Sequence, residues 1–296
     1  MKPYNKNIEF KSIDYYLEHW DDFFEKWEKD SKATFEEDVI WSKRLGKVWK
    51  TNEGKEKSTE LEYDVFPQPY LGNYKNHSVI TLNLNPSRSK KNKENIEFEK
   101  NNLPKFKEAK KYQKYAKDFP TYDTHPFWKK QDGWIDRIFK NLSKEKPSLK
   151  DIKPFAIEIC PWGSKSFQKL KINEDDSLIK YMDLHVFDVI EKVIEYSKLK
   201  IVLSVGKAYY NIFDNKKTDF KRLDEISYQE NKPEGIDWPQ TIDEDSGKDR
   251  DVKRTFSIWK KGKILYINTF ASGSNTPPAE HFNEIQNELI RKHLIK

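Results

Sequence analysis

The stretch that decides the fold reads Val79-Ile80-Thr81-Leu82-Asn83-Leu84-Asn85-Pro86-Ser87-Arg88. Its apolar alternation is typical of a buried strand, and Asn-Pro starts a turn because the residue before a proline is pushed out of the helical region. The last side chains of this strand are therefore expected at a sheet edge. In open α/β sheets, ligands bind at the edge formed by the carboxyl ends of the strands.

Three further apolar runs, residues 155–160, 201–205 and 264–267, end in polar loops. Between the runs, apolar residues recur at helical spacing over residues 134–142, 178–194 and 208–213. The chain also begins and ends with amphipathic patterns, behind a candidate cap at Ser12 and behind Thr276-Pro277. Strands that alternate with helices pair in parallel and are covered on both faces. The sequence therefore predicts a three-layer α/β/α fold with a mostly parallel central sheet.

The length of 296 residues is enough for one large domain or two small ones. No Pro/Gly/Ser-rich linker divides the chain, so we expect a single α/β domain over residues 1–296 with a helical extension over about 1–60. The polar stretches 51–62 and 214–255 lack sustained periodicity, which indicates surface loops or irregular excursions. We interpret the second stretch as a charged insertion at about 214–255.

The composition excludes several classes of site. One cysteine, Cys160, excludes a disulfide framework and any four-cysteine metal centre, and the six histidines show no metal-ligand spacing. The sequence contains no glycine-rich phosphate loop and no H-E-x-x-H motif. We expect no metal and no cofactor. With no apolar run of membrane-spanning length, we also expect a cytoplasmic protein without a membrane partner. The oligomeric state is left open.

The positive charge is concentrated in one segment. The chain has a net charge of +6, whereas residues 88–117 alone carry one Arg and ten Lys against four Glu. This segment begins at the Asn85-Pro86 turn, with Arg88, Lys90, Lys91 and Lys93 leading it. We interpret these four residues as phosphate contacts for DNA, either duplex or single-stranded. The alternative is a solvated, lysine-rich helical face.

The motifs resemble the uracil-DNA glycosylase superfamily, and more closely an uncharacterised branch of it. Residues 67–72, Pro-Gln-Pro-Tyr-Leu-Gly, followed by the strand and Leu84-Asn85-Pro86-Ser87, resemble the first motif of that fold. The later blocks follow in the same order over residues 63–290: His125-Pro126-Phe127, Trp134, Glu158-x-Cys160-Pro161-Trp162, Ser204-Val205-Gly206 and a final Ser/Asn/Pro loop. The resemblance implies a glycosylase-like fold and a DNA N-glycosylase, a hydrolase that acts on N-glycosyl bonds.

The resemblance also implies roles for single residues. Asn85 matches the Asn that holds the hydrolytic water, and the final loop offers Ser272 and Asn275 as further catalytic candidates. Glu158, Trp162 and Tyr70 are candidates for base binding, and Lys165 and Ser274 for contact with DNA. Several of these residues also have a structural alternative: a turn at Asn85, a lysine partner for Glu158, a core or cleft-wall position for Trp162, and capping of the last helix by Ser272, Ser274 and Asn275. Cys160 is expected to be a small buried hydrophobe.

Three departures from the superfamily bear on the substrate. The first motif ends in Ser87-Arg88 where Gly or Tyr is usual, and residues 269–272 lack the His that assists the departing base. Glu158 stands where many members offer an Asn to uracil. An ionised carboxylate only accepts hydrogen bonds, so Glu158 matches an exocyclic amino group and opposes the O4 acceptor of uracil. We therefore expect a cytosine-type, amino-bearing or modified base.

Three functions are compatible with these residues. The first is a DNA glycosylase that flips a nucleotide into a pocket between the strand ends and acts in repair. The second is a catalytically inactive nucleic-acid-binding module with the same fold, as the missing His would allow. The third is an antiphage enzyme that acts on modified DNA with a base pocket rebuilt around Glu158.

Overall fold

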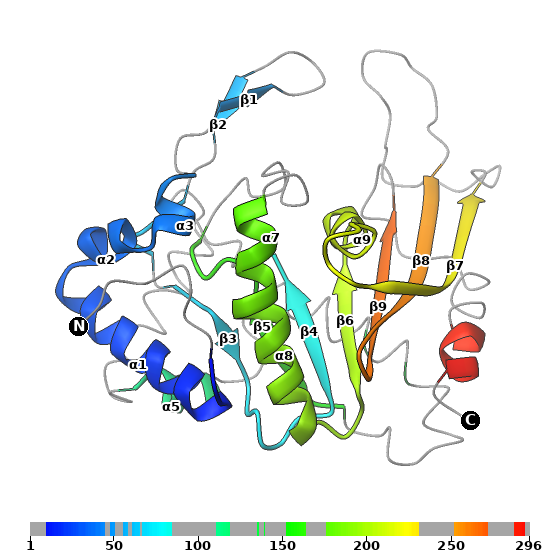
Figure 1. Ribbon diagram of the computed structural model, residues 1–296, viewed down its shortest axis with the longest axis horizontal. Helices are drawn as coiled ribbons and strands as arrows, with labels where there is room; N and C mark the ends of the chain where they lie inside the picture. The colour runs from blue at the N-terminus through cyan, green and yellow to red at the C-terminus, as the bar shows by residue number, and fades with distance from the viewer. Residues whose placement is uncertain are drawn as a thin grey trace, which may run out of the picture. The chain divides into compact units, whose positions relative to one another are not determined.

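A computed structural model of the chain describes residues 10–44, 48–50, 56–58, 61–65, 67–84, 111–118, 135, 139, 152–163, 176–230, 252–271 and 287–293. The chain divides into two compact units. Unit 1 comprises Met1–Asp132 and Lys153–Lys200, and unit 2 comprises Gly133–Ile152 and Ile201–Lys296. Each unit combines strands with helices, so the chain belongs to the α/β class (Figure 1).

The sheet of unit 1 has the order β3-β5-β4. Strands β4 (Val79–Asn83) and β5 (Pro154–Glu158) pair in parallel, and β3 (Tyr70–Leu71) pairs antiparallel with β5. All residues of these three strands are buried, which explains why their sequences are apolar almost throughout. The predicted strands that begin near residues 79 and 155 are confirmed.

Unit 1 begins with the predicted amphipathic helix, α1 (Ile13–Lys29). The hydroxyl Oγ of Ser12 accepts a hydrogen bond from the backbone N–H of Tyr15 at 3.1 Å, which confirms the expected cap. The apolar stripe of α1, from Ile13 to Trp27, is buried. Asp30 ends α1 and caps α2 (Ser31–Glu37), and Asp38 in turn caps the short α3 (Val39–Ser42).

The long helical pattern at residues 178–194 forms a helix with a π-helical turn in its middle. The run consists of α7 (Asp176–Met182), the π turn η3 (Asp183–Phe187), α8 (Asp188–Val193) and the 3₁₀ turn η4 (Ile194–Tyr196). Figure 1 shows α7 and α8 in front of β5 and β4. Unit 1 also contains α5 (Tyr112–Asp118) and a two-stranded ribbon of β1 (Val48–Lys50) and β2 (Glu56–Ser58).

The strands of unit 2 have the order β6-β9-β8-β7. The predicted strands β6 (Ile201–Val205) and β9 (Ile264–Ala271) pair in parallel, whereas β8 (Val252–Lys261) pairs antiparallel with β9 and with β7 (Lys221–Glu230). After β6 the chain turns at Gly206, whose φ of +139° favours glycine, into α9 (Lys207–Phe213). Helical residues 287–293 lie within the predicted last helix.

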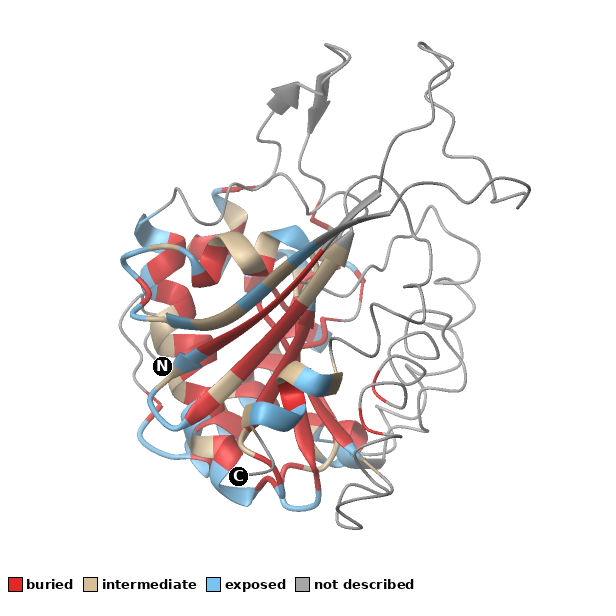
Figure 2. Ribbon diagram, turned by 90° about the vertical axis from the view of Figure 1, so that its right-hand side faces the viewer, coloured by how far each residue is buried: buried red, intermediate tan, exposed pale blue. Residues whose placement is uncertain are grey.

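Two sequence-based expectations differ from this arrangement. The strands pair partly in parallel and partly antiparallel, so the sheet is mixed rather than mostly parallel. The polar stretches 51–62 and 214–255 were expected to be loops or irregular, but the first contains β2, and the second contains β7 and the start of β8. Figure 2 shows the reason: the inner strands are buried, whereas β7 has exposed and intermediate residues, and a strand of that kind keeps charged side chains.

Candidate functional site

The candidate site lies at the carboxyl ends of β4 and β5, where the register of the parallel pair brings two polar residues together. Asn83 and Glu158 are the last paired residues of the two strands. Beyond them, the backbone N–H of Ile159 donates to the carbonyl of Asn83 at 2.8 Å, and that of Cys160 donates to Leu84 at 2.9 Å. The predicted catalytic residue Asn85 follows Leu84 directly in the sequence.

The side chains of Asn83 and Glu158 form a buried hydrogen-bonded pair. The amide Nδ2 of Asn83 donates to Oε1 of Glu158 at 3.2 Å, and each residue is only 5 % exposed. Side chains alternate between the faces of a sheet, so Asn83 and Glu158 share a face with Thr81 and Ala156, the pair two positions before them in the register. The carboxylate is therefore enclosed beside small side chains and held by a neutral donor.

Tyr70 lies on the other face of this sheet. Its register partner is Ile157, the neighbour of Glu158, and directly opposed residues on antiparallel strands point to the same side. The ring of Tyr70 packs against Phe155, with ring centroids 5.5 Å apart, and against Tyr16 and Tyr112. The structure thus places Tyr70 in an aromatic core and does not bring it together with Glu158.

Trp162 is also enclosed by unit 1. Its indole Nε1 donates to Oδ2 of Asp38 at 2.9 Å, and its ring meets the edges of Phe23 and Phe35. Burial raises the pKa of the Asp38 carboxyl to about 6, against the opposing effect of the Trp162 hydrogen bond. These contacts give Trp162 a structural role, the fastening of the capped end of α3 to the segment after β5.

Cys160, between the two candidate residues of this segment, is fully buried. Burial raises the pKa of its thiol well above the ordinary value, so its thiolate, the nucleophilic form, is strongly disfavoured. The expectation that Cys160 acts as a small buried hydrophobe agrees with this environment.

The remaining candidates lie outside the described residues: Asn85, Ser272, Asn275, Arg88, Lys90, Lys91, Lys93, Lys165 and Ser274. The described end of the lysine-rich segment is amphipathic. Tyr112 and Tyr115 are buried, whereas Lys114 and Lys117 are exposed. Exposed Lys111 lies 3.8 Å from the Asp21 carboxylate of α1. These described lysines therefore face solvent, which is the geometry expected of either reading of the segment.

Sequence reasoning missed Asn83, although its signal stands in the quoted stretch. Thr81, Asn83 and Asn85 alternate with Ile80, Leu82 and Leu84. A polar residue on the strand two positions before the motif Asn is therefore expected on one defined face of the sheet. What the sequence does not contain is the register that sets Asn83 opposite Glu158, because that pairing joins residues 75 positions apart.

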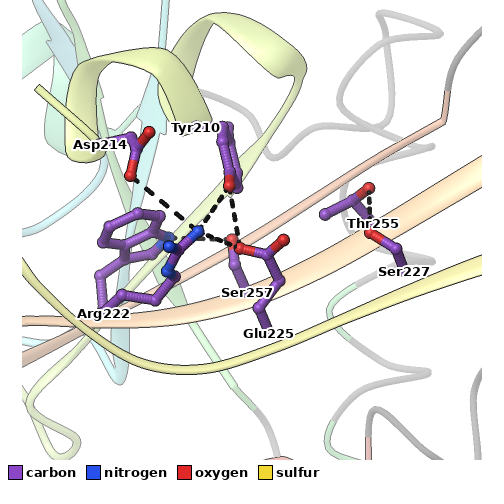
Figure 3. Close-up of polar contacts among 8 residues, drawn as sticks. Tyr210, Asp214, Arg222, Glu225, Ser227, Thr255 and Ser257 are labelled. Carbon is purple, nitrogen blue, oxygen red and sulfur yellow. Dashed lines mark hydrogen bonds and ion pairs between the residues drawn. The ribbon is translucent and has the colours of Figure 1, made fainter.

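Unit 2 contains polar arrangements of its own. Ser204, near the end of β6, and Asn268, in the middle of β9, are register partners. Both are buried, and Ser204 Oγ lies 3.0 Å from Asn268 Oδ1. Nearer the surface, Arg222 of β7 donates to the Tyr210 hydroxyl at 2.7 Å and to Glu225 at 2.5 Å (Figure 3). Its guanidinium also lies over the ring of Trp259, 5.3 Å from the centroid.

Figure 3 shows how this surface network joins its elements: Tyr210 comes from α9, Arg222 and Glu225 from β7, and Asp214 follows the end of α9. The Tyr210 hydroxyl donates to Glu225 at 2.9 Å, and Arg222 lies 4.0 Å from Asp214. Because two carboxylates already face the one guanidinium, the network is matched internally and does not offer a positive surface to phosphate.

No metal site or membrane segment emerges from the described ranges. Within them, no three His, Cys, Asp or Glu side chains gather closely enough to hold a metal ion. None of the helices among the same residues combines the length and apolarity needed to cross a bilayer.

No family model, curated protein or solved structure matches the chain.

Proposed function

We propose that the chain is a DNA glycosylase-like enzyme that hydrolyses the N-glycosidic bond of a flipped, amino-bearing base. The observation that carries the proposal is the buried Asn83–Glu158 pair at the carboxyl ends of two parallel strands, next to the exit of the chain toward Asn85. Ligands of open α/β sheets bind at such an edge, and a carboxylate there selects hydrogen-bond donors. The motif order of the uracil-DNA glycosylase superfamily supports the same assignment.

The proposed chemistry needs few groups. The N-glycosidic bond breaks through an oxocarbenium-like sugar, so the site holds a water near the sugar and positions the departing base. Asn85 orients that water through its amide carbonyl, which is too weak a base to deprotonate it fully. Glu158 accepts a hydrogen bond from the amino group of the base. Positioning and electrostatics then supply most of the acceleration, each contributing several kcal/mol.

DNA is the partner in this proposal, and residues 88–117 supply phosphate contacts that are independent of sequence. The enzyme would act in the cytoplasm, in repair or in defence against phage with modified bases. The finer fold assignment, a glycosylase-like three-layer arrangement, belongs to the same proposal.

A second candidate, a nucleic-acid-binding module without catalysis, rests on one specific observation. Residues 269–272 lack the His that assists the departing base in the superfamily. A chain that kept the cleft but lost this group would bind DNA and leave the glycosidic bond intact.

The deciding experiment is an abasic-site assay. The full-length protein is incubated with single-stranded and duplex oligonucleotides that carry cytosine, a modified cytosine, hypoxanthine or uracil, and abasic sites are cleaved with alkali and counted. We expect abasic sites at an amino-bearing base and fewer at uracil. Excision of uracil that is strong and unchanged in Glu158→Asn would overturn the assignment of the carboxylate. DNA binding without abasic sites on any substrate would favour the second candidate.

Binding is tested separately by its salt dependence. Lys90, Lys91 and Lys93 are replaced together by Ala, and the slope of log affinity for duplex DNA against log salt should become shallower by about 0.9 for each lost phosphate contact. A variant with Ala at the exposed Lys11, Lys29 and Lys32 carries the same change in net charge and serves as the control. Equal slopes in both variants would show that residues 88–117 are a solvated, lysine-rich face and do not contact phosphates.

A further inference from the structure

We propose that Asn83 is a positioning residue that holds the Glu158 carboxylate in the orientation from which it selects the base. The inference rests on the proposed function and deepens it, because it assigns base selectivity to a pair of residues on two strands. Asn83 itself makes no contact with the base in this proposal; it acts through Glu158.

The pair is fixed by backbone as well as by side chains. Asn83 and Glu158 are partners in the parallel ladder of β4 and β5. The hydrogen bond from Ile159 N–H to the Asn83 carbonyl, at 2.8 Å, holds the two strands together immediately beside the pair. On the far side of β5, the backbone N–H of Glu158 donates to the Pro69 carbonyl at 2.9 Å. Glu158 is therefore anchored in the middle of three backbone segments, which leaves mainly its side-chain rotations to be set.

The Asn83 amide sets those rotations. Its Nδ2 donates to Oε1 of Glu158 at 3.2 Å, and both groups are buried, where a hydrogen bond to a carboxylate is stronger than in water. The side chain of asparagine is short and has only two rotatable bonds. Its donor Nδ2 therefore stays close to the rigid strand that carries it. A carboxylate has two oxygens with about four acceptor positions. One fixed donor on Oε1 thus defines the direction in which the remaining acceptor positions point.

The test compares two Asn83 variants with a control at a buried hydrogen bond elsewhere in unit 1. Asn83→Leu removes the donor at similar volume, and Asn83→Asp restores it only when the new carboxyl is protonated. The control, Ser197→Ala, removes a buried hydrogen bond of 2.7 Å to the carbonyl of Ser78, just before the amino end of β4. The quantity measured is the ratio of kcat/KM for the amino-bearing base over uracil, from pH 8 to pH 5.

We expect the ratio to fall by about ten- to a hundredfold in Asn83→Leu, the range expected when one buried polar contact is lost. In Asn83→Asp the ratio should be lowest at pH 8, where two carboxylates repel each other, and should recover toward pH 5 relative to Asn83→Leu. Ser197→Ala should keep the wild-type ratio. A residue that only filled space would give no such difference in pH profile between the two variants.

A readout without catalysis accompanies these rates. In ¹⁵N-labelled full-length protein, the side-chain amide protons of Asn83 should exchange slowly with solvent and shift strongly in Glu158→Gln. A wild-type ratio in Asn83→Asp at pH 8, or an Asn83 amide signal indifferent to Glu158→Gln, would overturn the positioning role while the excision assay still stands. Absence of excision in the wild-type protein would instead show failure of the proposed function, and the inference would fall with it.

Discussion

Glu158 and Trp162 lie four residues apart, and both were expected at a base pocket, yet their surroundings give them different roles. Glu158 shares a strand-end face with small residues and a neutral amide, whereas Trp162 is packed between aromatic rings and hydrogen-bonded to the Asp38 carboxylate. An indole with its N–H satisfied and its ring covered is part of a core. In the proposed function, base recognition at this segment is therefore assigned to Glu158 alone among the described candidates.

For single residues, the prediction about catalysis concerns Asn85. Asn85→Ala should lower the single-turnover rate of excision by about two to three orders of magnitude, the usual effect of losing one positioning group. The affinity for DNA should stay the same, because Asn85 is proposed to act on the water and not on the phosphates. Rates come from rapid-quench assays, and affinities from fluorescence anisotropy. A wild-type single-turnover rate in Asn85→Ala would remove Asn85 from the mechanism.

For single residues, the sequence predicts the face of a strand on which a side chain lies better than it predicts the residue that this side chain contacts. The alternation of Thr81 and Asn83 with Ile80 and Leu82 is sufficient to assign faces of a strand. It is not sufficient to predict the Asn83–Glu158 pair, because strand register depends on packing across the whole sheet. The hydrogen bond from Trp162 to Asp38 could not be predicted either, because it joins residues 124 positions apart.

Among the elements, the inner strands were predictable and the outer hairpin was not. The apolar runs of β4, β5, β6 and β9 are buried except at Val205 and Leu265, and such strands keep a strong signal. The outer strand β7 holds Lys221, Arg222, Asp224 and Glu225 within its first half, which obscures its extended conformation. The pattern at residues 178–194 predicted a helix correctly, but it did not predict the π turn, at the end of which the Asp188 N–H donates to the Asp183 carbonyl five residues before it.

The polar network of Figure 3 explains how the polar strand β7 is attached to α9. Its contribution to stability can be tested by removing a single hydroxyl group. Tyr210→Phe removes the hydroxyl that bonds Arg222 and Glu225 but keeps the ring edges against Trp259 and Phe270. We expect a loss of about 0.5–1.5 kcal/mol in the free energy of unfolding, measured with urea. The control Tyr15→Phe, at an exposed tyrosine of α1, should change it by less than about 0.5 kcal/mol. Equal effects of the two substitutions would show that the network does not fasten α9 to β7.

For the molecule as a whole, the buried titratable groups of unit 1 set the response to acid. Burial lowers the pKa of His19, His77 and His185 to about 4, with neighbouring positive charge from Lys26, Lys200 and His19, respectively, adding to the shift. The backbone carbonyl of Tyr74 opposes the shift at His77. A histidine whose folded pKa lies below the ordinary 6.5 stabilises the fold above pH 6.5 and loses that contribution as the pH falls toward 4. Asp38, raised to about 6, acts in the opposite direction, because its folded form holds a proton more tightly than the unfolded chain does.

Three histidines oppose two aspartates, Asp38 and Asp21, because burial also raises the pKa of Asp21. The histidines are more numerous, so unit 1 should lose stability between pH 6.5 and pH 4. Each fully shifted histidine contributes up to about 3 kcal/mol. The double variant His19→Phe/His185→Phe keeps the aromatic contacts with Phe10 and removes two of the titrating groups. The melting temperature, measured in steps from pH 7.5 to pH 4, should therefore fall less steeply in the double variant, whereas Asp38→Asn should make the fall steeper. Parallel curves for the double variant and the wild-type protein would contradict the linkage, because they would mean that neither histidine changes its proton affinity on folding.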